Sequence, residues 1–179
     1  LVGLWFCSSK QVENETKETS EETNLASETA NLTSEDGLNL SAVKLPDGFT
    51  IEVFARVEYA RSIVLTPNGT LFVSNRRGDK VYALRDTNED GKADEQYIIA
   101  RGLEMPNGIA FKDGSLYVAE VSSLWRFDNI EANLSNPPKP VNIYDDYPSD
   151  KHHGWKFIAF GPDGKLYVPV GAPCNICES

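Results

Sequence analysis

The fold is decided by the segment Ile158-Ala-Phe-Gly-Pro-Asp-Gly-Lys-Leu-Tyr-Val168, in which two short apolar runs flank a turn containing Asp-Gly. Two upstream segments, 63–73 and 109–118, repeat this arrangement around Asn-Gly and Asp-Gly. Such a dipeptide between apolar runs is the strongest short-range signal of a β-hairpin. The turn glycines are spaced 45 and 50 residues apart. A repeat of about 40–50 residues with several strands per unit is typical of β-propeller blades.

Each of the first two repeats continues with two more apolar segments, which we predict to be its third and fourth strands: 81–84 and 97–100, then 124–127 and 141–144. The third repeat stops after its second strand, and residues 51–54 alternate as an outer strand would. We therefore predict an all-β partial propeller over residues 45–179, with about two and a half blades. Because propellers close into rings that remove exposed strand edges, we expect this chain to be part of a longer protein or to complete its ring in another way. A small β-sandwich is the alternative fold.

The residues before the repeats have a different composition. Residues 8–44 carry eight acidic residues, three lysines and eleven Ser or Thr, and their net charge of −5 is half of the total. Such a segment buries too little apolar area to offset its ordering entropy, so we predict a disordered acidic tether. Short exposed helices are the alternative. Residues 1–7 are interpreted as the end of a signal peptide or lipoprotein signal, with Cys7 as the lipidation site.

The overall charge and apolar content exclude several classes of protein. The chain has 17 Lys and Arg against 27 Asp and Glu, a net charge of −10. A nucleic-acid-binding protein would carry a basic patch, so we expect no nucleic-acid partner. No apolar run approaches the roughly 18 residues that a membrane-spanning helix needs, so we expect no transmembrane helix. We predict an exported protein, periplasmic or at the cell surface, with a lipid anchor at Cys7 as one interpretation.

The sharpest local motif is the acidic loop, Asp86-Thr-Asn-Glu-Asp-Gly-Lys-Ala-Asp94. Side-chain oxygens occupy positions 1, 3, 5 and 9, glycine occupies position 6, and position 7 would contribute a backbone carbonyl. Calcium prefers six to eight oxygen ligands, and the glycine permits the sharp turn. Position 12 is not a glutamate, so the loop is not an EF-hand. The predicted calcium ligands are Asp86, Asn88, Asp90, Lys92 and Asp94, and a solvated acidic turn is the alternative.

Polar residues directly before the inner strands are the candidates for chemistry. The two histidines of the chain, His152 and His153, precede the first strand of the third repeat. A histidine at this position could act as a general base, because its ordinary pKa suits proton transfer near neutral pH. Asn107 precedes the corresponding strand of the second repeat and is a candidate ligand contact. Loop residues without a chemical role are the alternative for all three. The segment 76–79 is expected to be a solvated hairpin.

The motif Cys174-Asn-Ile-Cys177 lies near the C-terminal end of the sequence. No histidine follows Cys177, which excludes covalent haem attachment, and no βαβ pattern surrounds the motif to suggest a thioredoxin-like role. A zinc site would need two further ligands. In an exported protein a disulfide between Cys174 and Cys177 is favoured.

Three segments resemble one known family, the sugar dehydrogenases that use pyrroloquinoline quinone (PQQ). Leu45-Pro-Asp-Gly-Phe-Thr-Ile-Glu-Val-Phe-Ala55 resembles the opening of soluble glucose dehydrogenase and L-sorbosone dehydrogenase relatives. His153 followed after seven residues by Gly161-Pro-Asp-Gly-Lys-Leu-Tyr is similar to their catalytic segment. Val170-Gly-Ala-Pro-Cys-Asn-Ile-Cys177 resembles the sorbosone dehydrogenase branch. The resemblance covers residues 45–179.

The resemblance implies a six-bladed propeller that holds PQQ over its channel and oxidises a sugar or aldehyde substrate for an external electron acceptor. His153 would take the hydroxyl proton while hydride passes to the quinone, and His152 would replace an acidic residue of the family. Asn175 falls on a loop that lines the substrate pocket. The family's cofactor-clamping residues belong to later blades, so this chain alone is not expected to oxidise sugar. A non-catalytic exported binding module and a lactonase-type propeller, suggested by Pro106-Asn-Gly108, are the alternatives.

Overall fold

The structure is a computed structural model that describes residues 2–6 and 38–176. The described residues fall into two compact units, one of residues 3–6 and 38–53 and the other, in the main, of residues 54–176. In the N-terminal unit, β1 (Val2–Phe6) pairs with β2 (Thr50–Ala55), and a short 3₁₀ helix, η1 (Leu40–Ala42), precedes β2. The predicted lipidation site Cys7 and most of the predicted tether lie outside the described residues.

The second unit contains the predicted blades. Its first sheet has the order β3 (Ala60–Leu65), β4 (Leu71–Asn75), β5 (Val81–Arg85), β6 (Glu95–Ala100). Its second sheet is β7 (Gly108–Lys112), β8 (Ser115–Ala119), β9 (Leu124–Phe127), β10 (Val141–Tyr144), and the third is β11 (Ala159–Phe160) with β12 (Leu166–Tyr167). All pairings in these sheets are antiparallel. The predicted all-β partial propeller is confirmed.

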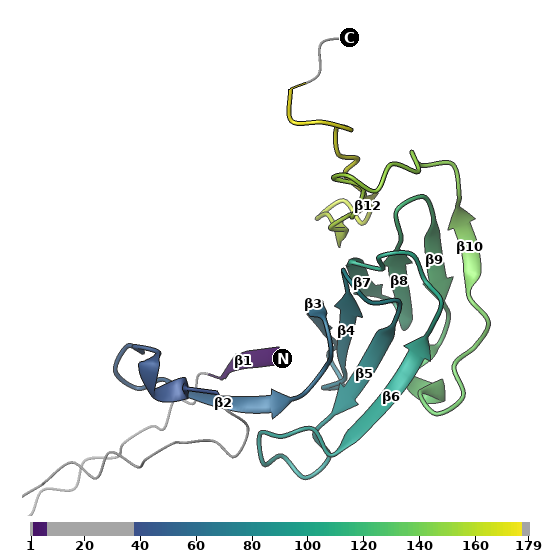
Figure 1. Cartoon of the computed structure of the whole chain (residues 1–179). Helices are drawn as coiled ribbons and strands as arrows, with labels where there is room; N and C mark the ends of the chain where they lie inside the picture. The colour runs from purple at the N-terminus through teal and green to yellow at the C-terminus, as the bar shows by residue number, and fades with distance from the viewer. Residues whose placement is uncertain (1, 7–37, 177–179) are drawn as a thin grey trace, which may run out of the picture. The chain divides into compact units, whose positions relative to one another are not determined.

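The first strand of each sheet faces the first strand of the next. β3 contacts β7, and β7 contacts β11. In Figure 1 the two four-stranded sheets lie side by side, with β3 and β7 close together and β6 and β10 at the outer edges. This is the radial arrangement of propeller blades, in which β3, β7 and β11 are the inner strands.

Hydrogen bonds between neighbouring blades show that all three are oriented alike. We call the end at which the inner strands begin the entrance face, and the end that carries the glycine turns the turn face. On the entrance face, Ser74 Oγ donates to Asn107 O at 2.8 Å, and Asn107 Nδ2 donates to Lys156 O at 2.7 Å. On the turn face, Thr66 Oγ1 donates to Glu131 Oε1 at 2.6 Å, and Lys112 Nζ donates to Gly164 O at 3.0 Å. The loops of one face therefore belong together across the blades.

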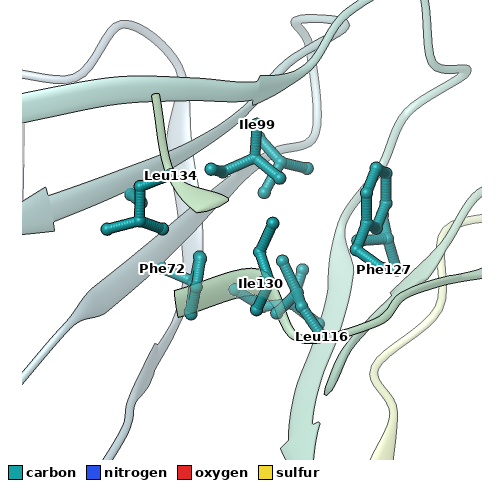
Figure 2. Packing of buried hydrophobic residues seen from close by; sticks show 10 residues of the cluster. Phe72, Ile99, Leu116, Phe127, Ile130 and Leu134 are labelled. Atoms are coloured by element: carbon teal, nitrogen blue, oxygen red, sulfur yellow. The ribbon is translucent and has the colours of Figure 1, made fainter. Parts of the chain in front are cut away.

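The principal hydrophobic core lies between the first two blades (Figure 2). It combines residues of β4, β5 and β6 with residues of β7, β8 and β9: Phe72, Val81, Ala83, Ile99, Ile109, Leu116, Val118 and Phe127. Ile130 and Leu134 complete it from a 3₁₀ helix, η2 (Ile130–Asn133), and its following residue. The sequence analysis did not predict η2. The feature of the sequence that could have indicated η2 is a pair of apolar residues, Ile130 and Leu134, four positions apart in a largely polar connection.

No helix in the described part of the chain is long and apolar enough to cross a membrane. The two helical segments described are 3₁₀ helices of three and four residues.

Candidate functional site on the entrance face

Asn107 links three blades at the entrance face. It is 4% exposed and lies directly before β7. Its carbonyl oxygen accepts from Ser74 of the first blade, and its Nδ2 donates to the main chain of Lys156 in the third. Its Oδ1 is buried without a hydrogen-bond partner among the described residues. A buried acceptor without a donor costs free energy, so an ordered water molecule that donates to Asn107 Oδ1 would stabilise this face.

Lys156 holds the loop of the two histidines against the second blade. Its side chain is 2% exposed, and Nζ donates to Val121 O and, at 3.1 Å, to Gly154 O. The ammonium also lies 4.9 Å from the ring centre of Tyr147. Burial lowers the pKa of Lys156 below its ordinary value of 10.5. Sequence reasoning missed this residue, since a lysine before a strand carries no local sign that it will be buried.

His153 is half-buried in a closely packed loop. Its φ is 58°, a left-handed conformation that non-glycine residues rarely adopt. The ring centroids of His152 and His153 are 4.0 Å apart. The rings of His153 and Trp155 form an edge-to-face pair with centroids 5.9 Å apart. A Cβ on Gly171 would lie 2.3 Å from His153 O, so only glycine permits this approach of the two loops.

One hydrogen bond decides which nitrogen of His153 can act as a base. Nδ1 lies 3.2 Å from the carbonyl oxygen of Ala172. A carbonyl only accepts, so in this contact Nδ1 carries the proton. In the neutral imidazole the lone pair is then on Nε2, which is the tautomer that a general base requires. The predicted base thus has a defined orientation.

The position of Arg76 shows that the prediction of a solvated hairpin at residues 76–79 is wrong for this residue. The residue is half-buried, and its guanidinium carbon lies 3.5 Å from the ring centre of Trp155. Trp155 also lines a pocket of about 470 Å³ together with Arg61, Asn107 and Phe157. Such cation–π stacking joins a loop of the first blade to the residue two positions after His153. Sequence reasoning missed the pair because 79 positions separate its members.

The acidic loop lies on the opposite face. The turn between β3 and β4 follows the pair Leu65–Leu71, and Leu71 pairs in turn with Leu84 of β5. The next residue, Arg85, pairs with Glu95 at the end of the β5–β6 ladder, so residues 86–94 lie on the turn face. Here Asp86 accepts from the main-chain N of Asp90 and Gly91, at 3.2 and 2.8 Å. Asp94 accepts from the Thr87 hydroxyl at 2.6 Å, which lowers the pKa of Asp94 below its ordinary 3.8. The acidic loop and the histidines therefore lie at opposite ends of the blades.

The acidic side chains of the loop are not gathered around one point. Among the described residues, no three His, Cys, Asp or Glu side chains form a group that could hold a metal ion. Asn88 Nδ2 donates to Asp90 Oδ2 at 3.2 Å, and Asp90 Oδ1 accepts from Lys92 N at 2.9 Å. The donor chemistry suits calcium, but an ion would have to replace hydrogen bonds such as those from Thr87 to Asp94.

The cysteine motif is described in part. Cys174 is disulfide-bonded, whereas Cys177 lies outside the described residues, so their pairing stays a prediction. Asn175 is exposed and follows the Gly171–Ala172 segment that contacts His153. The loop that carries Asn175 thus starts beside the histidines, while the side chain itself has no described contact with them.

The fold and this face define a partial β-propeller with a polar, aromatic entrance. Residues 35–176 match DUF7133, described as a domain of unknown function, and the chain belongs to this family. An uncharacterized protein of Borreliella burgdorferi is 23% identical over 151 residues, which cover 76% of this chain and 37% of that protein. The chain therefore spans little more than a third of this curated relative.

Solved structures share the fold. One is the holo form of the pyranose dehydrogenase PQQ domain from Coprinopsis cinerea, with 16% identity and a TM-score of 0.57 over 66% of this chain and 29% of that one. Another is XC5397 from Xanthomonas campestris, a gluconolactonase, with 19% identity and a TM-score of 0.53 over 73% of this chain and 40% of that one. Identities this low show a common fold and no more.

Proposed function

We propose that this chain forms part of a PQQ-dependent dehydrogenase that oxidises a hydroxyl group of a sugar or hydrated aldehyde. The observation that carries the proposal is His153, whose Nδ1 contacts Ala172 O and whose Nε2 is left as the base. Its position before an inner strand supports the role, since propeller sites are built where the inner strands meet the channel. The PQQ domain among the structures of similar fold supports the cofactor.

The residues of the entrance face fit a planar quinone that carries carboxylates. Trp155 offers an aromatic ring, and Arg76 offers a cation stacked on it. When bound, PQQ would supply the two-electron acceptor for the hydride of the substrate, and an external electron acceptor would reoxidise it. His153 Nε2 would take the hydroxyl proton, while His152 and Asn175 would contact the substrate. Proton removal by a placed base contributes about 10²–10⁴-fold to such a rate.

The proposal is tested on the full-length protein reconstituted with PQQ and calcium. We expect dye reduction with at least one member of a panel of aldoses, sorbosone-type ketoaldehydes and simple aldehydes. No reduction with any of them would reject the dehydrogenase. The panel should be repeated without PQQ, where the expected rate is that of the buffer.

A lactonase is the second candidate, because a gluconolactonase shares the fold and Asn107 precedes an inner strand in Pro-Asn-Gly. Hydrolysis of gluconolactone that needs a divalent cation, but not PQQ, would favour it. A protein active in neither assay would fit the non-catalytic binding module.

We also propose that the acidic loop binds calcium through Asp86, Asn88, Asp90, Asp94 and the carbonyl of Lys92. Such an ion would stabilise the connection between β5 and β6, and it would take no part in the chemistry of the opposite face. The spacing of these oxygen ligands around Gly91 supports the proposal.

Replacing Asp90 with alanine is expected to weaken calcium binding by an order of magnitude or more, since it removes one charged ligand. The measurement is calorimetric titration of Ca²⁺ into the wild type and the variant. Asp145→Ala, an exposed carboxylate outside the loop, is the control and should bind as the wild type does. Equal heats in wild type and Asp90→Ala would reject the calcium site.

Export to the periplasm or cell surface is proposed as well. The disulfide at Cys174 supports it, because disulfides persist in oxidising compartments. Lipid attachment at Cys7 stays a prediction.

A further inference from the structure

We propose that Arg76, stacked on Trp155, binds a carboxylate group of the ligand that occupies the entrance face. This inference deepens the proposed function and rests on it for the identity of the ligand. It adds Arg76 to a face whose pocket is lined by Arg61 of the first blade together with Asn107 and Trp155.

The first support is the way in which Arg76 is held. The guanidinium carbon lies 3.5 Å from the Trp155 ring centre, so its flat face is covered by the indole. Stacking through this face leaves the N–H groups at the edge of the guanidinium, where they can bind a carboxylate in a bidentate manner. A stacked side chain also loses less conformational entropy on binding than a free one.

The second support is that the described part of the chain offers no acceptor to Arg76. Within residues 2–6 and 38–176, no hydrogen bond or ion pair of its guanidinium is described. Five donors at a half-buried position thus have no protein partner in this part of the chain.

The third support is that no carboxylate of the entrance face is described as a partner of Arg76, and three of them have other partners. Glu104 forms an ion pair with Lys151 at 2.7 Å. Glu120 accepts from Trp125 Nε1 at 2.6 Å, and Asp79 accepts from Gly102 N at 3.0 Å. Within the described residues, neither these three acids nor the exposed Glu58 and Asp150 form an ion pair with Arg76, so its positive charge can pair with an anion from a ligand.

Two carboxylates fit this position and the chemistry of the proposed function. One belongs to PQQ, and the other to a sugar acid such as gluconate, the product of a lactonase. The shared group is a carboxylate, and the two sources are separated by titrating each compound on its own.

The test is calorimetric titration of PQQ and of gluconate into the full-length protein and three variants. Arg76→Gln is expected to lower the affinity for whichever compound binds by about 10–100-fold, because a charged hydrogen bond is lost. Arg76→Lys should fall between, because an ammonium keeps the charge but not the planar fork. Arg77→Gln is the matched control, since Arg77 is exposed and adjacent and has no described ring contact; its affinity should stay within about twofold of the wild type.

A second readout separates a carboxylate contact from a merely structural role. Rising salt should weaken binding more steeply in the wild type than in Arg76→Gln, because only the wild type has the ionic contact. Thermal unfolding of each variant shows whether it is folded. If Arg76→Gln is not folded, the affinity of Arg76→Lys is compared with that of the wild type instead.

Weakened PQQ binding supports both the Arg76 site and the cofactor. Weakened gluconate binding without any PQQ binding supports the Arg76 site and rejects the dehydrogenase. Equal affinities in Arg76→Gln and Arg77→Gln, or no binding of either compound to the wild type, overturn the inference.

Discussion

Replacing His153 with glutamine is expected to lower kcat of the reconstituted full-length protein by about 10²–10⁴-fold, the contribution of a placed general base. Glutamine has similar polarity and reach, but no nitrogen that can take a proton at neutral pH. Because Nδ1 donates to Ala172 O, the lone pair of the neutral ring is on Nε2. The variant therefore removes the proton acceptor and changes little else.

Steady-state dye reduction with the best substrate measures this effect, and calorimetry with PQQ checks that the variant still binds the cofactor. Asp145→Ala is the control, because Asp145 is exposed and the proposed function gives it no role. We expect a loss of less than about tenfold there. A kcat that survives His153→Gln would reject His153 as the base.

Replacing Phe72 with alanine is expected to lower the free energy of unfolding by about 3–5 kcal/mol, as large-to-small changes in a packed core do. Phe72 is fully buried, and its ring centre lies 6.1 Å from that of Phe111 in the next blade. Figure 2 shows it facing the side chains of the second blade and η2. The cavity would thus open at the contact that joins two blades.

Urea unfolding of the full-length protein measures the change. Phe157→Ala provides a control of the same chemistry, because Phe157 is 67% exposed in this structure, and its loss should cost about 0.5 kcal/mol or less. Equal costs for the two variants would show that the interface between the first two blades is not the principal core.

The strands were predictable because their signals are local. Each hairpin is specified by a glycine turn and by the apolar residues beside it, so the ten strands of the three blades occur where the sequence analysis expected them. The connection before β10 was not predictable in the same way. Residues 130–133 form η2 because Ile130 and Leu134 can reach the core between two blades, a contact that no local pattern states.

The residues of the candidate site were likewise predictable only where their signals are local. His152, His153 and Asn107 could be selected because they precede inner strands, and repeats indicate where inner strands begin. The burial of Lys156, the free Oδ1 of Asn107 and the tautomer of His153 depend on atoms of other blades or loops. So does the separation of the acidic loop from the histidines, which lie at opposite ends of the blades.

Turn chemistry and apolar periodicity along the chain are thus sufficient to predict a β-propeller with repeated blades. Which side chains meet on the entrance face was decided by the packing of one blade against the next. Arg76 stacks on Trp155 because the first and third blades approach each other there, although 79 positions separate the two residues in the chain. The physical reason is range, since a hairpin is specified by adjacent residues, whereas a site between blades exists only after the distant segments have packed together.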